Sequence, residues 1–544
     1  MLKNKQNPLA LKNVKIKDDF WSRYVELVHD AIIPYQWDIM NDKIEGAEPS
    51  HCIQNFKIAA GLEQGEFYGM VFQDTDLAKW LEAVAYSLEI QPNEKLEEIA
   101  DYAIDLVAQA QGADGYVNTY YTIAEPEGRW TNLQEGHELY TAGHFIEAAV
   151  AYYNATGKDK LLKVMSKFAD YIYETFGHEE GKLKGYPGHQ EIELALVKLY
   201  EVTKNKKYLE LSKYFIDERG QEPYYFDLEF EERGGGYIFP VFEYLTREYL
   251  QAHSSVLKHD TAEGHSVRAV YMYAGMADLA YEYKDAEMLK ACERLFDNIV
   301  NRRMYITGGI GSAESGERFT GDYDLPNDIN YSETCASIGF AMFFQRMLNI
   351  TKNAKYADVM EKALYNTVLA GISLRGTEFF YVNPLEVWPY ACEKHPAKSH
   401  VKTTRQKWFG VACCPPNIAR TLASLGQYIY SVAKDEVYMN MFVENKTTFF
   451  LNDQEVILEQ QTKYPFQNMV NISCDSKEEN EFTLAIRIPS WCMGAKVKVD
   501  GENIDVNENL NKGYLYIKKV WHGISKIEVI FDMPAQLMEA NPKV

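Results

Sequence analysis

This 544-residue sequence has few cysteines, fewer basic than acidic residues, and no long apolar segment. Its eight cysteines are too sparse for a disulfide framework, so we expect thiols or metal ligands in a reducing compartment. No stretch approaches the roughly 20 uninterrupted apolar residues of a membrane span. The basic residues 1–5 lead into no apolar core of a signal peptide, so we expect a cytoplasmic protein.

Positive charge is also in deficit, since 56 Lys and Arg face 79 Asp and Glu, for a net charge of −23. Such a surface repels phosphate backbones, so we expect no nucleic-acid partner and no membrane surface. Aromatic residues are abundant, with 39 Tyr, 26 Phe and 8 Trp. That surplus is typical of clefts that hold sugar rings, although a large aromatic core explains it equally well.

Long segments with helical periodicity fill most of the sequence between residues 75 and 435. They are 96–111, 138–155, 161–176, 191–202, 267–283, 286–303, 336–350, 355–374 and 418–432. Short polar hinges such as Thr156-Gly157-Lys158-Asp159 recur between them at uneven intervals. Uneven spacing argues against an open solenoid and favours a closed ring of helical hairpins. We therefore predict a catalytic (α/α)6 barrel over residues 6–434.

Three long insertions interrupt this pattern, at residues 221–245, 305–334 and 375–417. Long loops inside a compact domain are usually functional, so we expect them to build a site at one mouth of the barrel. After residue 434 the pattern changes to short β-rich runs separated by turns such as Asp500-Gly501. This predicts an all-β sandwich over residues 435–544, with residues 1–5 as a candidate for pairing with it.

Glu333, Cys335 and the adjacent pair Cys413-Cys414 are the most specific chemical signal. Three thiols and a carboxylate can form a tetrahedral zinc site, because thiolates are soft anionic ligands. The spacing is not that of a zinc finger, and Pro415-Pro416 would have to impose an irregular backbone. Buried inert cysteines and a strained vicinal disulfide are the alternatives.

The 305–334 insertion is rich in acidic residues. Counted from Asp322, acids fall at positions 1, 3, 7 and 12, but Asn327 stands where an EF-hand needs glycine, so we reject a calcium loop. General acid–base catalysis by one carboxylate is the better functional interpretation. The clusters at 234–236 and 308–311 follow no strand-to-helix context, so phosphate binding is unsupported.

Four histidines lie in settings that suit a polar cleft: His137, His144, His189 and His265. Each could hydrogen-bond substrate hydroxyls, and any single one could equally be a structural histidine.

Taken together, the sequence resembles glycoside hydrolase family 127, whose founding activity is β-L-arabinofuranosidase. The resemblance runs over roughly residues 6 to 530. Its motifs include Pro34-Tyr35-Gln36-Trp37, His137-Glu138-Leu139-Tyr140, Tyr186-Pro187-Gly188-His189-Gln190, Gly264-His265-Ser266-Val267-Arg268, Glu333-Thr334-Cys335-Ala336, Tyr381-Val382-Asn383-Pro384-Leu385 and Cys413-Cys414-Pro415-Pro416-Asn417. The family fold is an (α/α)6 barrel followed by β-sandwich modules, which agrees with the pattern above.

The resemblance implies a role for each matching residue. The metal ligands of a Zn²⁺ ion would be Glu333, Cys335, Cys413 and Cys414. Cys413 would be the nucleophile and Glu317 the general acid/base. Sugar contacts would come from His137, His189, His265, Tyr381 and, more weakly, Gln36. Whether His137 or His144 makes the first of these contacts stays open.

Family members usually continue into a second β-module, whereas this sequence stops at Val544. We therefore expect that any oligomer interface made by such a module is missing, which leaves the oligomeric state open. The catalytic constellation is complete.

The resulting hypothesis is a zinc-dependent retaining exo-glycosidase that releases arabinofuranose or a related pentose through a cysteine-linked intermediate. Two rivals remain. One is a metal-free epimerase or unsaturated-uronide hydrolase on the same barrel, and the other is a non-catalytic carbohydrate-binding protein with a structural zinc.

Overall fold

Six helices form the inner ring of a barrel in the computed structural model, which describes residues 5–544. They are α4 (Thr75–Ile90), α7 (Glu138–Thr156), α9 (Ile192–Thr203), α12 (Ser266–Glu282), α14 (Thr334–Thr351) and α17 (Cys414–Ala423). Each contacts the next, and α17 contacts α4, which closes the ring.

A second helix packs outside each inner one. Five of these outer helices directly follow their inner partners: α5 (Glu94–Ala110), α8 (Lys160–Thr175), α10 (Lys206–Glu218), α13 (Ala286–Asn298) and α15 (Lys355–Ala363). The sixth position is taken by α1 (Trp21–Leu27) and the π-turn Val28–Ile32, which contact α17 and lead into α2 (Ile33–Met40). The predicted (α/α)6 barrel is therefore confirmed.

Three of the five repeated polar hinges cap the outer helix that follows them, whereas the N-cap residues of α8 and α15, Asp159 and Ala354, make no side-chain cap. Asn93 accepts a hydrogen bond from the backbone N–H of Leu96 at the start of α5, and Asp285 does the same for Met288 in α13. Such side chains satisfy amide groups that have no partner within the helix. The hinge sequence recurs because each hairpin needs a new helix start.

One predicted helix is partly wrong. The segment 418–432 is helical only to Ala423, and Tyr430–Ala433 forms strand β3 instead. The helix begins earlier than expected, at Cys414, with prolines in its first turn, where proline is tolerated. Gly426 lies just beyond the helix, and a Cβ added there would come within 3.1 Å of the Leu11 side chain. The chain is therefore closely packed against Leu11 where it leaves the barrel.

The strands after the barrel form two sets that share their two longest members, β7 (Met469–Arg487) and β11 (Tyr514–Phe531). The first half of β7 pairs with β6 (Gln454–Thr462). The second half of β11 pairs with β8 (Ala495–Val499). The other half of β7 pairs with β4 (Glu436–Met439), and a register shift between Trp521 and Gly523 separates the halves of β11. All these strands belong to one continuous hydrogen-bonded sheet, and the two long strands run through both of its parts.

Two short N-terminal strands join this sheet: β1 (Asn7–Pro8) pairs with β3, and β2 (Val14–Ile16) pairs with β5 (Asn445–Leu451). The expected pairing of residues 1–5 falls mostly outside the described residues, and the Lys5 ammonium lies 3.2 Å from Glu201 of the barrel. The domain division at residue 434 stays a prediction.

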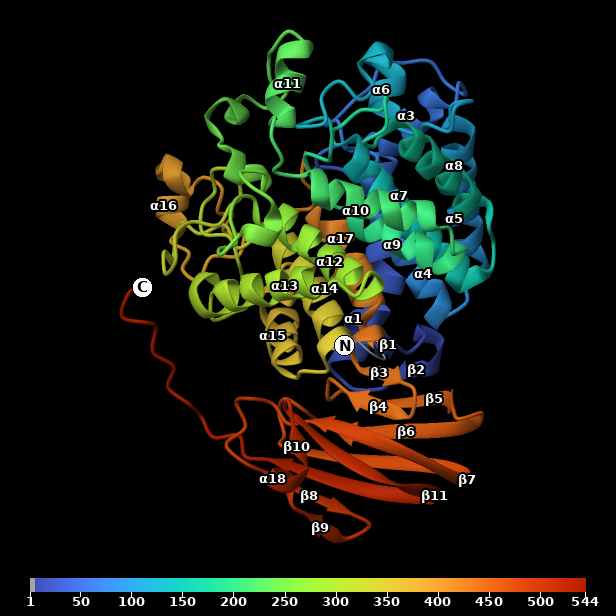
Figure 1. Cartoon of the computed structure of the whole chain (residues 1–544), viewed down its shortest axis with the longest axis vertical. Coiled ribbons are helices and arrows are strands. Elements are labelled where there is room, and N and C mark those ends of the chain that lie inside the picture. Colours follow the sequence, from blue (N-terminus) through green and yellow to red (C-terminus); the bar gives the residue numbers. More distant parts are fainter. Residues whose placement is uncertain (1–4) are drawn as a thin grey trace.

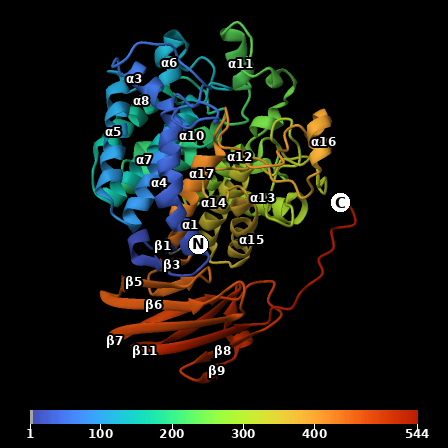
Figure 2. The same cartoon turned by 180° about the vertical axis from the view of Figure 1, so that it is seen from behind.

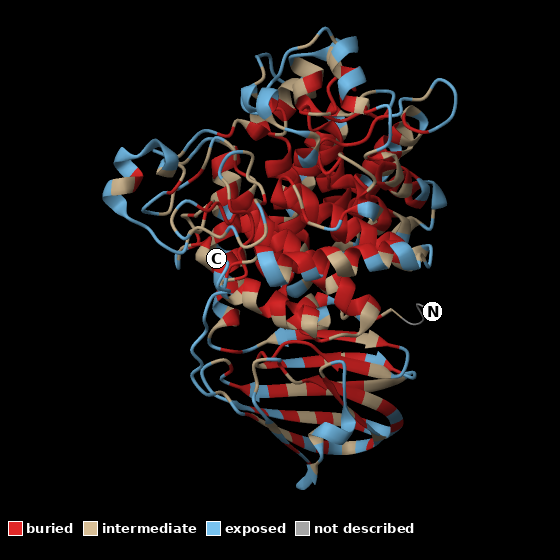
Figure 3. Ribbon diagram, turned by 60° about the vertical axis from the view of Figure 1, so that its left-hand side comes forward, coloured by how far each residue is buried: buried red, intermediate tan, exposed pale blue. Residues whose placement is uncertain are grey.

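The three insertions all precede inner helices, so they gather at the N-terminal mouth of the ring. Figures 1 and 2 place the sheet at one end of the molecule and α11 (Tyr225–Glu232), from the first insertion, at the opposite end. Figure 3 shows buried residues filling the centre of the barrel and alternating along the strands. No helix among residues 5–544 combines the length and apolar character needed to cross a membrane.

Candidate active site

The predicted zinc ligands converge at the N-termini of two inner helices. Glu333 directly precedes α14 and Cys335 lies in its first turn, while Cys413 directly precedes α17, which Cys414 begins. Helix N-termini carry partial positive charge and stabilise nearby anions. The fold therefore brings four acidic groups from two distant segments to a place that favours their charged forms.

The three sulfurs are too far apart for a disulfide and lie close enough together, with Glu333, to hold a metal ion. The Cys335 sulfur lies 3.3 Å from that of Cys413 and 3.1 Å from that of Cys414, and the two adjacent sulfurs are 3.9 Å apart. Glu333 Oε1 lies 3.3 Å from the Cys413 sulfur. Zn–S bonds of about 2.3 Å would separate two sulfurs by about 3.8 Å, whereas a disulfide needs about 2.05 Å.

Burial opposes ionisation of these groups. It raises the pKa of Cys413, of Cys414 and of Glu333. Burial acts in the same direction on Cys335, but hydrogen bonds from the other two thiols lower its pKa to about 6. Glu333 Oε2 is buried and has no hydrogen-bond partner. The donor set is therefore suited to a cation that would compensate several anionic ligands at once.

Glu317 has both carboxylate oxygens engaged. The phenol of Tyr331 donates to Oε1 at 2.7 Å, and Nε2 of His265 lies 2.6 Å from Oε2. Burial alone would raise the pKa of Glu317, but hydrogen bonds from His265 and Tyr331 lower it below its ordinary value. Ligand atoms of Glu317, His265 and Glu333 lie within 4.8 Å of one another, so this carboxylate sits beside the thiol cluster.

The protonation of His265 follows from its position before α12. Its Nδ1 accepts hydrogen bonds from the backbone N–H groups of Val267 and Arg268, at 3.1 and 3.3 Å. An accepting Nδ1 leaves the proton of the neutral ring on Nε2, which therefore donates to Glu317. The predicted sugar contact is thus also a partner of the acid/base candidate.

His137 and His189 are held in the opposite tautomer to His265, because Nδ1 of each ring faces a backbone carbonyl. Nδ1 of His137 bonds to the carbonyl of Glu135, and that of His189 lies 2.9 Å from the carbonyl of Gln190. Burial lowers the pKa of His137 to about 3 and that of His189 well below its ordinary value, so both rings are neutral. Their Nε2 atoms are then acceptors, which suits hydroxyl donors of a sugar.

These residues line one cavity of about 550 Å³ at the mouth of the barrel. Seven of the predicted residues are among its walls: His137, His189, His265, Glu317, Glu333, Tyr381 and Cys413. The phenol oxygen of Tyr381 lies 2.6 Å from the Cys413 sulfur. Cys335 and Cys414 lie behind the cavity wall, so only one of the three clustered thiols faces the space where a ligand would bind.

Two residues considered as sugar contacts, His144 and Gln36, do not line this cavity. His144 does not line the cavity but lies deeper, with Nδ1 3.2 Å from Glu191, which favours His137 as the first sugar contact. Gln36 does not line the cavity either, and both polar atoms of its buried amide lack partners.

Sequence reasoning missed several residues that complete the site. Tyr331 carries no motif of its own, and only its place two residues before Glu333 could have suggested it. Tyr140 lines the cavity and accepts a hydrogen bond of 2.9 Å from the ammonium of buried Lys79. Its signal was present, because Tyr140 follows His137 by one helical turn in the same motif.

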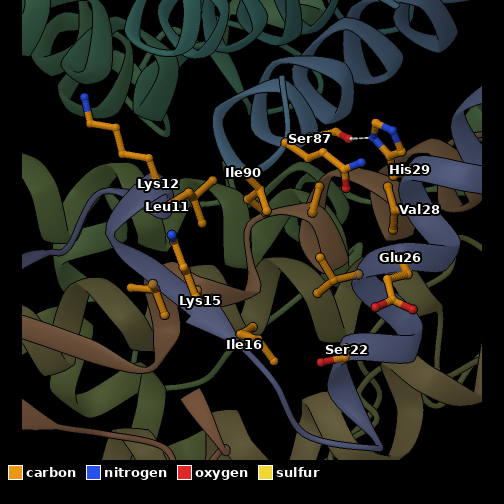
Figure 4. Close-up of a pocket in the computed structure, with 15 residues that line it drawn as sticks. Leu11, Lys12, Lys15, Ile16, Ser22, Glu26, Val28, His29, Ser87 and Ile90 are labelled. Atoms are coloured by element: carbon orange, nitrogen blue, oxygen red, sulfur yellow. Dashed lines mark hydrogen bonds between the residues drawn. The ribbon is translucent and has the colours of Figure 1, made fainter. Parts of the chain in front are cut away.

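A separate pocket, drawn in Figure 4, contains no comparable cluster of acidic side chains and thiols. It measures about 250 Å³ and is lined by residues such as Lys12, Glu26 and His29, whose Nδ1 lies 2.8 Å from the Ser87 hydroxyl. Glu26 is the one acid in its wall and no thiol reaches it, so we assign the active site to the cavity beside Cys413.

Comparisons with known proteins identify the family of the chain. Residues 13–427 match the family model described as Beta-L-arabinofuranosidase, GH127 catalytic domain, and residues 436–533 match the GH127 middle domain. The chain is 40% identical to the non-reducing end beta-L-arabinofuranosidase of Bifidobacterium longum subsp. longum, over 98% of this chain and 83% of that protein.

Solved structures give the same result. A GH127 beta-L-arabinofuranosidase from Geobacillus stearothermophilus T6 is 53% identical with a TM-score of 0.95, over 98% of this chain and 83% of that one. A second GH127 beta-arabinofuranosidase is 35% identical with a TM-score of 0.88, over 100% of this chain and 83% of that one. The chain therefore belongs to glycoside hydrolase family 127 and is a carbohydrate-cleaving enzyme.

Proposed function

We propose that the protein is a zinc-dependent retaining exo-glycosidase, a β-L-arabinofuranosidase that uses Cys413 as its nucleophile. The observation that carries this proposal is that Cys413 and Glu317 line the same cavity, whereas Cys335 and Cys414 do not. The choice of sugar follows the activity of the relatives at 40% and 53% identity, both β-L-arabinofuranosidases.

Each step needs a group that the cavity supplies. Glu317, once protonated, gives its proton to the leaving oxygen while the Cys413 sulfur attacks C1 from the opposite face. The bond to the leaving group breaks and a thioglycosyl enzyme forms. Glu317, now a carboxylate, takes a proton from water, which attacks C1 and releases the sugar with its original configuration.

The remaining residues hold the sugar and the proton in place. The acceptor nitrogens of His137 and His189 face sugar hydroxyls, and His265 and Tyr331 orient the Glu317 carboxylate. Zn²⁺ held by Glu333, Cys335, Cys413 and Cys414 would keep the thiols deprotonated despite their burial. Such a cluster requires reduced cysteines, which supports a reducing compartment such as the cytoplasm.

A screen of 4-nitrophenyl furanosides and pyranosides, with metal analysis of the same sample, tests the proposal. We expect hydrolysis of the β-L-arabinofuranoside, a first-formed product of β configuration by NMR, and about one zinc per chain. Turnover of pyranosides alone would contradict the sugar assignment. Active protein with a metal content near zero would favour the metal-free rival.

Glu317→Gln tests the acid/base role in the same assay. Hydrolysis of poor leaving groups should fall by roughly 10²-fold or more, because general acid catalysis has that scale. Aryl glycosides need little protonation, so their first step should suffer less. Asp324→Asn, an exposed acid of the same loop, is the matched control and should retain activity. Equal losses on both substrate types would show that Glu317 only positions the sugar.

A further inference from the structure

One buried cation beside the catalytic cavity has no carboxylate partner. Lys79 lies on α4 and is only 1% exposed, and no Asp or Glu among residues 5–544 comes within 4.0 Å of its ammonium nitrogen. Its hydrogen bond, of 2.9 Å, goes to the phenol oxygen of Tyr140 on α7. A buried ammonium without a counterion is unfavourable. The position of Lys79 is therefore better explained by its effect on Tyr140 than by a contribution to stability.

The bond from Lys79 fixes how the Tyr140 hydroxyl can act. An ammonium only donates hydrogen bonds, so the phenol oxygen is the acceptor and its own proton must point elsewhere. Within the described part of the chain this hydroxyl donates to no protein acceptor. Tyr140 borders the catalytic cavity, so a ligand there can accept the proton. The adjacent positive charge polarises the phenol and makes it a stronger donor.

The rings beside Tyr140 supply the matching acceptors. The centroid of the Tyr140 ring lies 4.2 Å from that of His189 and 5.5 Å from that of His137, and all three residues border the cavity. Nε2 of each histidine is an acceptor, because Nδ1 faces a backbone carbonyl. A sugar hydroxyl both donates and accepts, so it can donate to a histidine and accept from Tyr140 at once. An ether oxygen or a C–H group cannot do both.

We propose that Tyr140 is a specificity-determining residue, whose O–H donates to the same sugar hydroxyl that donates to His189. Lys79 is the positioning residue that holds and polarises the phenol. The inference rests on the proposed function, because it takes the ligand to be a furanose. A sugar that lacks this hydroxyl leaves a donor and an acceptor unpaired in a buried site, and such sites reject the deoxy analogue strongly.

Tyr140→Phe tests the donor, because it removes the hydroxyl and keeps the packed ring. The substrates are 4-nitrophenyl β-L-arabinofuranoside and its 2-deoxy, 3-deoxy and 5-deoxy analogues, and the measurement is kcat/KM of the zinc-loaded chain. On the parent sugar we expect a loss of about 10–100-fold, the scale of a hydrogen bond from a polarised group. On the analogue that lacks the recognised hydroxyl, this variant and wild type should agree within about twofold.

Lys79→Met tests the positioning role. It should slow hydrolysis of the parent sugar about tenfold, and the double variant with Tyr140→Phe should be no slower than Tyr140→Phe alone, because Lys79 acts through the phenol. If Lys79→Met does not fold, the comparison of substrates in Tyr140→Phe decides the proposal alone. Tyr152→Phe is the matched control, since it removes a hydroxyl from the same helix that bonds to Asp101 outside the cavity.

The substrate series separates recognition from a structural role. Equal losses in Tyr140→Phe on the parent sugar and on all three deoxy analogues would overturn the proposal, because a distorted cavity slows every substrate alike. Additive losses in the double variant would show that Lys79 does not act through Tyr140. A wild type that hydrolyses no furanoside would overturn the proposed function instead.

Discussion

Two buried acidic clusters lie at opposite ends of one helix, α17, and their negative charge is compensated in different ways. At its N-terminus Cys413 and Cys414 join Glu333 and Cys335. Toward its C-terminus Arg420 contacts the carboxylates of Glu82 and Glu147, at 2.7 and 2.6 Å. The second group continues into His144 and Glu191, and these two with Glu147 also lie close enough together to hold a metal ion.

The second group, here called the inner cluster (Glu82, His144, Glu147, Glu191 and Arg420), has protein cations that compensate its negative charge. Arg420 and Lys198 both pair with Glu147, and although burial would raise the pKa of that carboxyl, the two cations hold it well below its ordinary value. Burial and the neighbouring Glu147 hold the pKa of Glu191 well above its ordinary value, so Glu191 is neutral. A metal ion there would be repelled by two fixed cations.

The cysteine cluster has no such partner. Within residues 5–544 no Lys, Arg or His pairs with Glu333, and the nearby Lys79 is bonded to Tyr140 instead. The comparison teaches that geometry alone does not identify a metal site. Of two similar clusters, the one whose acidic groups form no ion pair with a protein cation is the one that needs a cation from outside.

The largest effect is expected from Cys413→Ser. If the protein still binds zinc, turnover should fall by at least roughly 10³-fold, because a hydroxyl is far less ionised than a thiolate. Cys414→Ser should fail mainly through weaker metal binding and recover partly in excess zinc. The measurements are kcat and zinc stoichiometry of both variants.

An electrophilic furanose analogue gives an independent check of the same assignment. Mass spectrometry should place its covalent adduct on Cys413. An adduct on Glu333, or near-normal turnover in zinc-replete Cys413→Ser, would show that the nucleophile is a carboxylate.

Arg420→Met should have the next largest effect, and it should fall on stability. Removing the cation leaves Glu82 and Glu147 buried without their main partner, which typically costs about 3–5 kcal/mol. Zinc content should not change. Unfolding in urea with metal analysis of the folded fraction measures both. A variant that lost its metal while keeping its stability would break the distinction between the two clusters.

The sequence predicted the cysteine cluster better than the inner one, for a physical reason. Cys335, Cys413 and Cys414 are rare residues in a matched motif, so their convergence could be expected. Glu147 and Glu191 lie in segments with helical periodicity and belong to no motif, and nothing in the sequence shows that both face the barrel axis. Their roles depend on packing between α7, α9 and α17, which periodicity cannot specify.

The same limit explains which elements were missed. Helix α4 received no range of its own in the prediction, because residues on nearly all its faces are buried, including Lys79 and Glu82, so it shows no polar face. The β-rich runs at 514–520 and 526–531 predict two separate strands, but they form the single strand β11. Gly523 interrupts the alternating pattern, and the register shift there carries the strand across the interruption. Outer helices were not found more reliably, because α10 (Lys206–Glu218) and the α1–α2 segment at the sixth outer position also lay outside the predicted segments.

A smaller contrast is expected within the inner cluster itself. Glu147→Gln removes an ionised partner of Arg420 and Lys198, so unfolding free energy should fall by roughly 2–3 kcal/mol. Glu191→Gln replaces a neutral acid by an amide of the same shape, so its cost should stay below about 1 kcal/mol. Denaturant unfolding at pH 7 compares them directly. A larger loss in Glu191→Gln would show that Glu191 is the ionised member.

The last contrast is a pH dependence, which the Glu191→Gln variant separates from that of other buried carboxyls with raised pKa values, such as Asp76 and Glu138. Its folded pKa is raised, so above the ordinary value of 4.5 the unfolded chain loses this proton while the folded chain keeps it. The unfolded state then binds fewer protons, and stability declines as pH rises, by at most about 1.4 kcal/mol per pH unit. Glu191→Gln removes that decline, so its stability relative to wild type should increase between pH 5 and pH 8.

Glu147→Gln is the built-in control for this measurement. The folded pKa of Glu147 is depressed, so its carboxyl is ionised in both folded and unfolded chains throughout pH 5–8. The deficit of this variant should therefore be constant over that range and shrink only as the pH falls below about 4.5, where wild type loses the contribution of the ion pair. Parallel pH trends for the two variants would mean that the proton is shared between the carboxyls rather than held by Glu191.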